Sequence, residues 1–266
     1  MEKIVSLQNP RIKQLLKLDK ARERQLQNLF PVEGFHEVSA AVRAGYTLHS
    51  VFIYPEASSR HPVDALIRSL RDRCPVFEVG RAVFERIAYR DHSDGIIATA
   101  EPRYHTLETL QLSANPLLIV LEAVEKPGNL GAILRTADAS KADAVIVCDR
   151  QTDIYNPNAV RSSIGCIFSK QVVTCSSQEA LNWLRSKHIH IYGASLQAAR
   201  WYHETDFTTP CALVMGTESE GLTSFWTSQS DANIKIPMRG EADSLNVSVA
   251  TAILCFEAMR QRGFRD

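Results

Sequence analysis

The feature of this sequence that most restricts its fold is a run of five consecutive apolar residues, Leu117–Leu121. A strand with one buried face alternates between apolar and polar residues, whereas an unbroken apolar run is typical of a strand buried on both faces. Such strands occur in parallel sheets that helices cover on both sides. The run therefore predicts an α/β fold with a mostly parallel sheet.

Similar short runs recur along the C-terminal part of the chain and alternate with helical patterns, as a parallel sheet requires. The helix predicted over Ser244–Arg262 is the clearest, because its apolar residues recur at steps of three and four. The other expected strands are Ala144–Cys148, Gln171–Thr174, His190–Ala194, Ala212–Met215 and Asn233–Ile236, and the other expected helices are Asn129–Ser140 and Gln178–Ser186.

A smaller set of alternating strand and helix patterns precedes this part and ends at about Glu101. Residues 102–116 then mix polar residues with prolines and show little periodicity, which indicates a linker. We therefore expect an N-terminal α/β domain over residues 1–101, a linker over 102–116 and a second α/β domain over 117–266.

The composition is ordinary for a soluble globular protein, with 45% apolar and 23% charged residues. No window approaches the roughly 20 apolar residues of a membrane span, and the first residues lack the pattern of a signal peptide. The six cysteines are scattered, without a Cys-x-x-Cys pair or a histidine cluster nearby. This usage favours reduced thiols in the cytoplasm and argues against a metal site.

The formal net charge is zero, so the overall charge neither suggests nor excludes a nucleic-acid partner. The first 30 residues, however, carry seven Lys and Arg against three acidic residues, and they include Arg11, Lys13 and Lys17. Two interpretations stay open from this segment alone. It is either a basic helix that contacts RNA phosphates or a solvated helix packed on its neighbour.

The first of three unusual loops follows the strand Leu117–Leu121. Pro127 and Gly128 mark a turn there, and Asn129 is expected to cap the next helix. Arg135 lies farther along that helix, where it either binds an anion or pairs with Asp138 at the surface. The residues alone do not decide between these roles.

The second loop, Gly216–Leu222, has the glycine spacing of a phosphate-binding loop. It lacks the Lys-Ser/Thr pair that such loops need, and Glu218 and Glu220 would repel a phosphate. These residues favour a ligand that is partly cationic or rich in hydroxyl groups. The alternative is a plain turn with solvated acidic side chains.

The third loop leads from Ile236 into the last helix through Ser244 and Asn246. Polar residues at a helix start suit a polar ligand, because the first amide groups of a helix lack intrahelical partners. A Gly-x-Gly-x-x-Gly motif and histidines at metal-ligand spacing are both absent. A dehydrogenase or a metal hydrolase is therefore poorly supported.

Together the three loops resemble the motifs of the SpoU/TrmH family of RNA ribose 2′-O-methyltransferases, in the SPOUT superfamily. The resemblance covers most of the second domain. It implies a deep trefoil knot there, a preceding domain similar to ribosomal protein L30e, and a homodimer. The matching segments are Asn129–Ala137, Tyr155–Gly165, Met215–Leu222, Ile236–Met238 and Ser244–Ala250.

The resemblance also assigns roles to residues, with S-adenosylmethionine as the cofactor and no metal. Gly216, Ile236 and Leu245 are the positions whose backbone meets the cofactor, and Ala194, Ser195 and Met238 are expected in its wall. The residues implied in catalysis are Arg135, Asn129, Glu220, Ser244 and Asn246, and those implied in RNA binding are Arg161, Arg11, Lys13 and Lys17.

The substrate implied by the resemblance is RNA, with 23S rRNA expected before tRNA. A non-catalytic RNA-binding protein of the same fold is the main alternative. The family's proton acceptor corresponds to Arg135, but a guanidinium is a poor base. We therefore expect Arg135 chiefly to bind the phosphate beside the target ribose. The last helix and the Asp153–Gly165 region are the expected dimer contacts.

Overall fold

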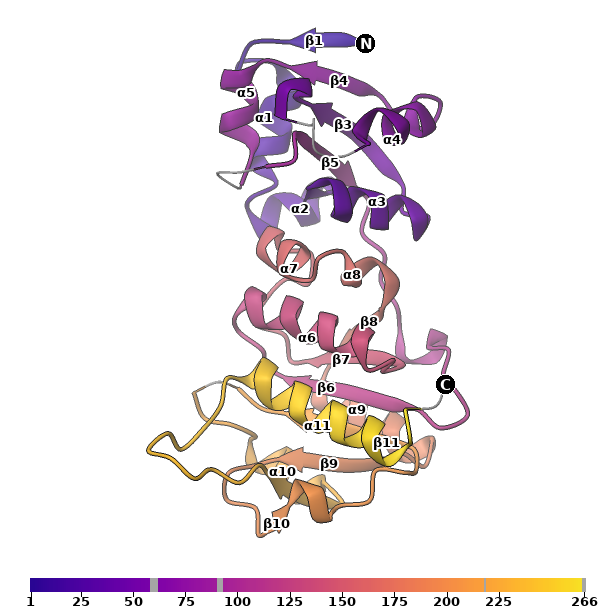
Figure 1. Cartoon of the computed structure of the whole chain (residues 1–266), viewed down its shortest axis with the longest axis vertical. Coiled ribbons are helices and arrows are strands. Elements are labelled where there is room, and N and C mark those ends of the chain that lie inside the picture. The colour runs from indigo at the N-terminus through magenta and orange to yellow at the C-terminus, as the bar shows by residue number, and fades with distance from the viewer. Residues whose placement is uncertain (58–61, 90–92, 218, 265–266) are drawn as a thin grey trace. The chain divides into compact units, whose positions relative to one another are not determined.

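The computed structural model describes residues 1–57, 62–89, 93–217 and 219–264. The chain forms two compact units. The N-terminal unit contains Met1–Arg103 and Asp153–Ser169, and the C-terminal unit contains Tyr104–Thr152 and Lys170–Asp266. Both units are α/β layers (Figure 1), and the second has the mostly parallel sheet that the sequence predicts.

The N-terminal unit is built on a five-stranded sheet in the order β1-β4-β3-β5-β2. Strand β5 runs antiparallel to β2 and β3, whereas β4 runs parallel to β1 and β3. The strands are β1 (Glu2–Ile4), β2 (Phe30–Glu33), β3 (Leu48–Ile53), β4 (Val76–Val79) and β5 (Ile96–Ala100), and the helices are α1 (Pro10–Lys17), α2 (Ala21–Gln27), α3 (Phe35–Arg43), α4 (Val63–Leu70), α5 (Arg81–Ile87), α7 (Pro157–Ser162) and α8 (Cys166–Ser169).

The basic N-terminal segment folds into two helices, α1 and α2. Asn9 caps α1 by accepting a hydrogen bond from the Arg11 amide, and Pro10 occupies the first turn, where its missing N–H costs nothing. The apolar side of α1 is buried in the core, with Ile12 and Leu15 as its inward residues. Not all of the basic residues face solvent, because Arg24 on α2 is only 5% exposed. Its role is therefore structural rather than direct contact with phosphate.

The C-terminal unit is built on a seven-stranded sheet in the order β10-β12-β9-β11-β6-β7-β8, and all of its strand pairs are parallel. The strands are β6 (Leu117–Glu122), β7 (Ala144–Cys148), β8 (Gln171–Cys175), β9 (His190–Ala194), β10 (Arg200–Trp201), β11 (Cys211–Met215) and β12 (Ala232–Lys235), and the helices are α6 (Pro127–Ala139), α9 (Ser177–Ser186), α10 (Ser224–Gln229) and α11 (Val247–Gln261).

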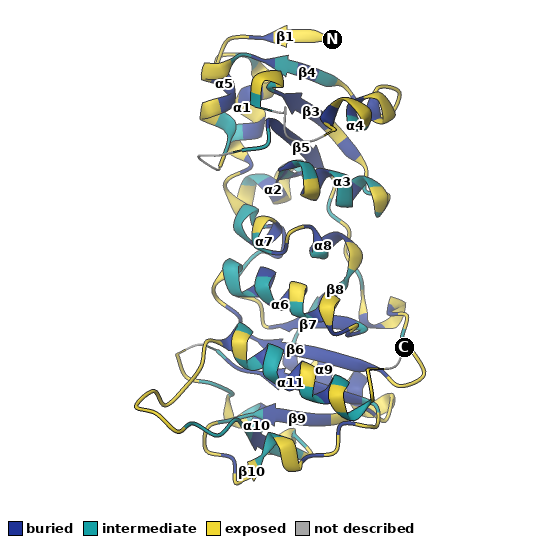
Figure 2. Ribbon diagram, in the orientation of Figure 1, coloured by how far each residue is buried: buried dark blue, intermediate teal, exposed yellow. Residues whose placement is uncertain are grey.

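The central strands are buried over their whole length, as unbroken apolar runs predict. Every residue of β6, β7 and β11 is buried, and Figure 2 shows β6 and β7 in the colour of buried residues. The chain alternates between strands and helices that cover the sheet, which is why both faces of these strands are shielded from water.

Helices α6 and α11 begin two or three residues away from their expected starts. Helix α6 begins at Pro127 with Lys126 as its N-cap, so the prediction that Asn129 caps it is wrong. Proline favours the first helical position because it has no amide hydrogen to satisfy. Helix α11 begins at Val247 rather than Ser244, and Asn246 is its N-cap.

The compact units differ from the expected domains in two places. Most of the expected linker belongs to the C-terminal unit, because Leu107 and Leu110 pack into its hydrophobic core. The segment Asp153–Ser169, expected within the second domain, belongs instead to the N-terminal unit. There α7 packs against β2, and α8 packs against α3.

Within the described residues no helix is long and apolar enough to cross a membrane. All six cysteines are free thiols.

Candidate active site

A cavity of about 310 Å³ opens over the carboxyl ends of β9, β11 and β12. Ligands of parallel sheets bind at this edge. Three segments wall the cavity. They are the residues after β9, the loop after β11 and the stretch from β12 into α11. Its lining includes Ala194, Ser195, Gly216, Glu220, Leu222, Lys235, Ile236, Met238, Asp243, Ser244 and Leu245.

The structure brings the predicted cofactor residues together in this one cavity. Gly216, Ile236 and Leu245 line it, as do Met238 and the pair at the end of β9, Ala194 and Ser195. These residues come from positions between 194 and 245, so only the folded chain makes them neighbours. Two of the five predicted catalytic residues, Glu220 and Ser244, line the same cavity.

Gly216 has no room for a side chain. A Cβ atom at this position would overlap the Gly221 carbonyl carbon and the Leu222 nitrogen. The loop closes on itself here, because the backbone of Thr217 and Gly221 exchanges two hydrogen bonds of 3.0 and 3.1 Å. Glycine is thus required by close backbone approach. Glu218, which the sequence places in this loop, lies outside the described residues.

The cavity combines an apolar wall with acidic groups at its rim. Ile236, Met238 and Leu245 supply apolar surface, whereas Glu220 and Asp243 supply carboxylates. This combination suits a ligand with a flat apolar part and a positive charge. Within the described residues no group of three or more metal-ligating side chains occurs.

Glu122 is a part of the site that sequence reasoning missed. Its side chain ends β6 and is 4% exposed. Its two carboxylate oxygens accept hydrogen bonds from the Thr223 backbone amide at 2.9 Å and the Thr223 hydroxyl at 2.6 Å. The bonds tie the far end of the Gly216–Leu222 loop to the central strand. A carboxylate that ends an apolar run was a signal that could have found it.

Lys235 is a second residue of the site that the sequence analysis did not predict. It lines the cavity while its ammonium group lies 4.5 Å from the centre of the Trp201 ring. This cation–π contact joins the edge strand β10 to β12. An isolated lysine in a strand gives no sequence signal for such a role.

Two further predicted catalytic residues meet beside the cavity. The Asn246 side-chain amide donates to the Asn129 side-chain oxygen at 3.2 Å, across 117 positions of sequence. Asn246 also accepts from the Ser248 amide at 2.9 Å as the N-cap of α11. The start of α11 is therefore held against the first turn of α6.

Arg135 lies on the same helix as Asn129, roughly 9 Å farther along its axis at 1.5 Å per residue. Its side chain is exposed and does not line the cavity. Asp138, its expected surface partner, forms an ion pair with Lys170 at 3.6 Å. Among the residues that the structure describes, no hydrogen bond or ion pair occupies the Arg135 guanidinium, so its donors can reach a ligand.

The predicted RNA-binding residues all lie in the N-terminal unit. Arg11, Lys13 and Lys17 are exposed on α1, although the Arg11 guanidinium also lies 4.6 Å from the centre of the Phe77 ring. Arg161, on α7, lies 5.9 Å from the centre of the Tyr89 ring. The cofactor and catalytic candidates all lie in the C-terminal unit.

These features define a two-unit α/β protein with a cavity over the carboxyl ends of parallel strands. The SpoU rRNA Methylase family model matches residues 116–256, and the MRM3-like substrate binding domain model matches residues 9–98. The chain belongs to the SpoU rRNA methylase family.

Individual relatives match nearly the whole chain. A 23S rRNA (guanosine(2553)-2′-O)-methyltransferase, RlmP of Bacillus subtilis, is 30% identical over 96% of this chain and 98% of its own. The 23S rRNA (guanosine-2′-O-)-methyltransferase RlmB of Photobacterium profundum is 35% identical over 86% and 96%. The crystal structure of an AdoMet-bound rRNA methyltransferase from Sinorhizobium meliloti has a TM-score of 0.89, with 30% identity over 97% of both chains.

Proposed function

We propose that this protein is an S-adenosylmethionine-dependent methyltransferase that methylates a ribose 2′-hydroxyl of 23S rRNA. The observation that carries the proposal is the cavity that gathers six separately predicted cofactor residues. Relatives that align with most of this chain are 23S rRNA 2′-O-methyltransferases, and a structural relative binds S-adenosylmethionine.

The chemistry of the cavity fits this cofactor. Ile236 and Leu245 offer apolar surface to an adenine ring, and the tight turn at Gly216 lets the backbone approach its polar edge. The carboxylates of Glu220 and Asp243 favour the positive charge of a sulfonium group. When bound, the cofactor supplies an electrophilic methyl group.

The remaining residues act on the RNA. The Arg135 guanidinium binds the phosphate beside the target ribose and lowers the pKa of the 2′-hydroxyl, whose proton passes to water as its oxygen attacks the methyl group. The hydrogen-bonded pair Asn129 and Asn246 orients the ribose, with Ser244 at the cavity rim. Methyl transfer of this kind depends mainly on the positioning of the two reactants.

The same proposal covers the wider properties that the family resemblance implies. The C-terminal unit contains a trefoil knot, the N-terminal unit has the fold of ribosomal protein L30e, and the protein acts on ribosomal RNA in the cytoplasm. Within this unit α11 packs against α6 and β11.

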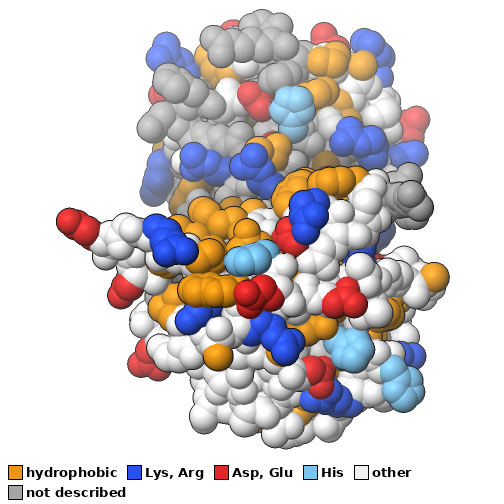
Figure 3. All heavy atoms as spheres, turned by 60° about the horizontal axis from the view of Figure 1, so that its bottom comes forward, with side chains coloured by type: hydrophobic (Ala, Val, Ile, Leu, Met, Phe, Trp, Pro, Cys, Tyr) orange, Lys and Arg blue, Asp and Glu red, His pale blue; other side chains and the backbone are white. Residues whose placement is uncertain are grey.

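We place a homodimer contact on α11, where Val249 and Phe256 are 47% and 43% exposed. Figure 3 shows hydrophobic side chains exposed on the face of the molecule turned forward in that view. The Asp153–Gly165 region is the second proposed dimer contact, and Ile164 in it is 51% exposed.

The proposed function is tested by mapping 2′-O-methyl groups in the RNA of the host with and without this gene. We expect one 23S rRNA ribose to lose its methyl group on deletion and to regain it when the gene is restored. Loss of a methyl group from tRNA alone would support the alternative substrate, and an unchanged map would contradict the proposal.

The contact between Glu122 and Thr223 gives a prediction for cofactor binding. Thr223→Val removes the hydroxyl donor and keeps the backbone amide, so the Gly216–Leu222 loop should loosen. We expect the Kd for S-adenosylmethionine to rise about tenfold, as loss of a hydrogen bond to a buried charge costs about 1.5 kcal/mol. Titration calorimetry measures this Kd.

Thr223→Ser is the matched control, because it keeps the hydroxyl and should bind the cofactor normally. Equal affinities of the valine and serine variants would show that this contact does not support the cofactor loop.

A further inference from the structure

The segment Asp153–Ser169 belongs to the methylase family match but packs in the N-terminal unit. Apolar contacts attach it, and the Tyr155 ring lies 4.2 Å from that of Phe30. The Tyr155 hydroxyl also donates to the Arg103 carbonyl at 2.5 Å. This segment lies within the residues that match the methylase family model. It nevertheless packs in the unit that contains the match to the substrate binding domain model.

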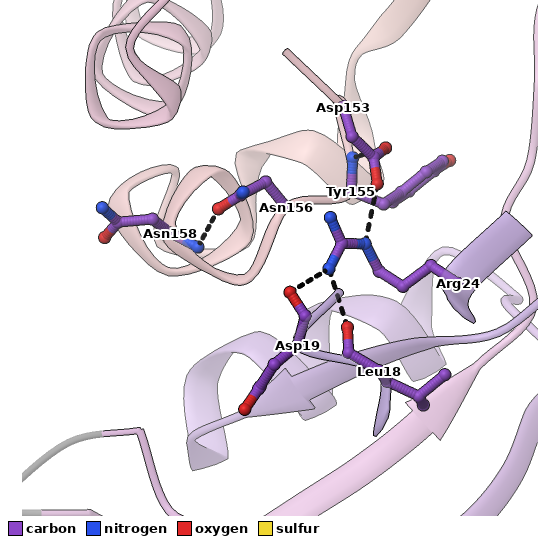
Figure 4. Close-up of polar contacts among 7 residues, drawn as sticks. All are labelled: Leu18, Asp19, Arg24, Asp153, Tyr155, Asn156 and Asn158. Atoms are coloured by element: carbon purple, nitrogen blue, oxygen red, sulfur yellow. Dashed lines mark hydrogen bonds and ion pairs between the residues drawn. The ribbon is translucent and has the colours of Figure 1, made fainter. Parts of the chain in front are cut away.

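A buried ion pair fixes the start of this segment (Figure 4). Arg24 Nε donates to Asp153 Oδ2 at 2.7 Å, and the two side chains are 4% and 14% exposed. Arg24 Nη1 donates to the carbonyl oxygens of Leu18 and Asp19 at 2.7 and 2.9 Å. One guanidinium therefore joins α2, the end of α1 and the residues before α7.

The contact continues directly into α7. Asp153 Oδ1 accepts from the Tyr155 amide at 3.0 Å, and Asn156 caps the helix by accepting from the Asn158 amide at 2.9 Å. Arg161 lies one turn farther on, beside Tyr89. The position of the Arg161 guanidinium thus depends on a chain of contacts that begins at Arg24.

The two side chains of the pair are largely shielded from water. Burial raises the pKa of the Asp19 carboxyl, although Arg24 opposes this shift. A buried ion pair often adds little net stability compared with apolar residues of similar size, and its best-attested use is to select one arrangement of the elements that it joins. The apolar contacts of Tyr155 hold the segment in place, whereas the ion pair sets its register.

We propose that Arg24 is a positioning residue for RNA binding. Through Asp153 it fixes α7 so that Arg161 meets a phosphate of the RNA substrate. This inference rests on the proposed function. It assigns to a buried arginine a part in substrate binding that it performs without touching the substrate.

The test uses a variant that removes the ion pair without leaving a buried charge, Arg24→Met combined with Asp153→Asn. We expect it to fold, and we expect its KM for 23S rRNA to rise about tenfold, as Arg161→Ala should do. The Kd for S-adenosylmethionine should stay at the wild-type value. Amide hydrogen exchange should be faster in α7.

The decisive comparison adds Arg161→Ala to the paired variant. If Arg24 acts through Arg161, the combined variant has the same KM for RNA as Arg161→Ala alone. Arg24→Lys, which keeps the charge, should recover part of the affinity. Arg81→Met is the control, since Arg81 forms an exposed ion pair with Glu85 in the same unit, and its KM should be that of the wild type.

Three results would overturn the inference. The first is a normal KM for RNA in the folded paired variant. The second is that the paired change and Arg161→Ala have additive effects on this KM. The third is that the paired variant loses as much affinity for S-adenosylmethionine as it loses for RNA. Each presupposes that the wild-type protein methylates RNA. A wild type that transfers no methyl group to any RNA would contradict the proposed function itself.

Discussion

Replacing Arg135 with alanine is expected to lower kcat for methyl transfer by about 10²- to 10³-fold, the usual effect of removing one preorganised charge from a reacting centre. The Arg135 side chain is exposed and lies outside the cavity lining. The Kd for S-adenosylmethionine should therefore be unchanged. Single-turnover kinetics with 23S rRNA and calorimetry with the cofactor measure the two effects separately.

Arg135→Lys tests how the side chain acts. Lysine keeps the positive charge but loses the planar fork that binds phosphate through two hydrogen bonds. We expect it to recover part of the lost rate. Arg185→Ala, which removes an exposed arginine paired with Asp231, is the matched control and should keep full activity. Near-normal turnover in both Arg135 variants would contradict the assigned role.

Gly216→Ala is expected to weaken cofactor binding by about 10- to 100-fold, because forcing an extra methyl group into a packed site costs about 1–3 kcal/mol. The added Cβ would overlap the backbone of Gly221 and Leu222, so the loop that walls the cavity must move. Flexible side chains could give way to a methyl group, but backbone atoms held by two hydrogen bonds cannot do so cheaply.

Gly240→Ala provides the control for this substitution. Gly240 lies in the loop before α11, and nothing within 4 Å would meet a Cβ there. Its variant should bind S-adenosylmethionine like the wild type in calorimetry. A Gly216→Ala protein that binds the cofactor with wild-type affinity would show that the cavity is not the cofactor site.

The sheet of the C-terminal unit was predictable because its central strands have recognisable local sequence patterns. Unbroken apolar runs identify β6, β7 and β11, because burial on both faces favours apolar residues throughout a strand, and Glu122 at the end of β6 is the one exception among them. Strand β10 has only two residues and exists through its pairing with β12. Its own sequence carries no period, so it could not be predicted.

Helix starts were less predictable, because several polar residues compete for each cap. Asp243, Ser244 and Asn246 are all suitable N-caps, and the structure uses Asn246. Which residue becomes the N-cap depends on where α11 meets α6. The side chain of Asn246 donates a hydrogen bond to that of Asn129 at this contact. Such a contact depends on the folded chain.

The placement of Asp153–Ser169 could not be predicted for the same reason. Arg24 and Asp153 are 129 positions apart, and the sequence around each is compatible with a solvated surface. The loops of the candidate site were singled out because they carry glycine, asparagine and acidic residues at strand ends, and the roles of their individual residues came from the family resemblance. Glu122 escaped notice because it acts only through its contact with Thr223.

The most direct test of the central claim follows a labelled methyl group from S-adenosylmethionine into 23S rRNA. The purified protein is incubated with both, the RNA is digested to nucleosides, and the labelled product is identified by mass spectrometry. The proposed function predicts label in one 2′-O-methylnucleoside, and loss of that label with Arg135→Ala. Label on a base, or no transfer by the wild-type protein, would contradict it.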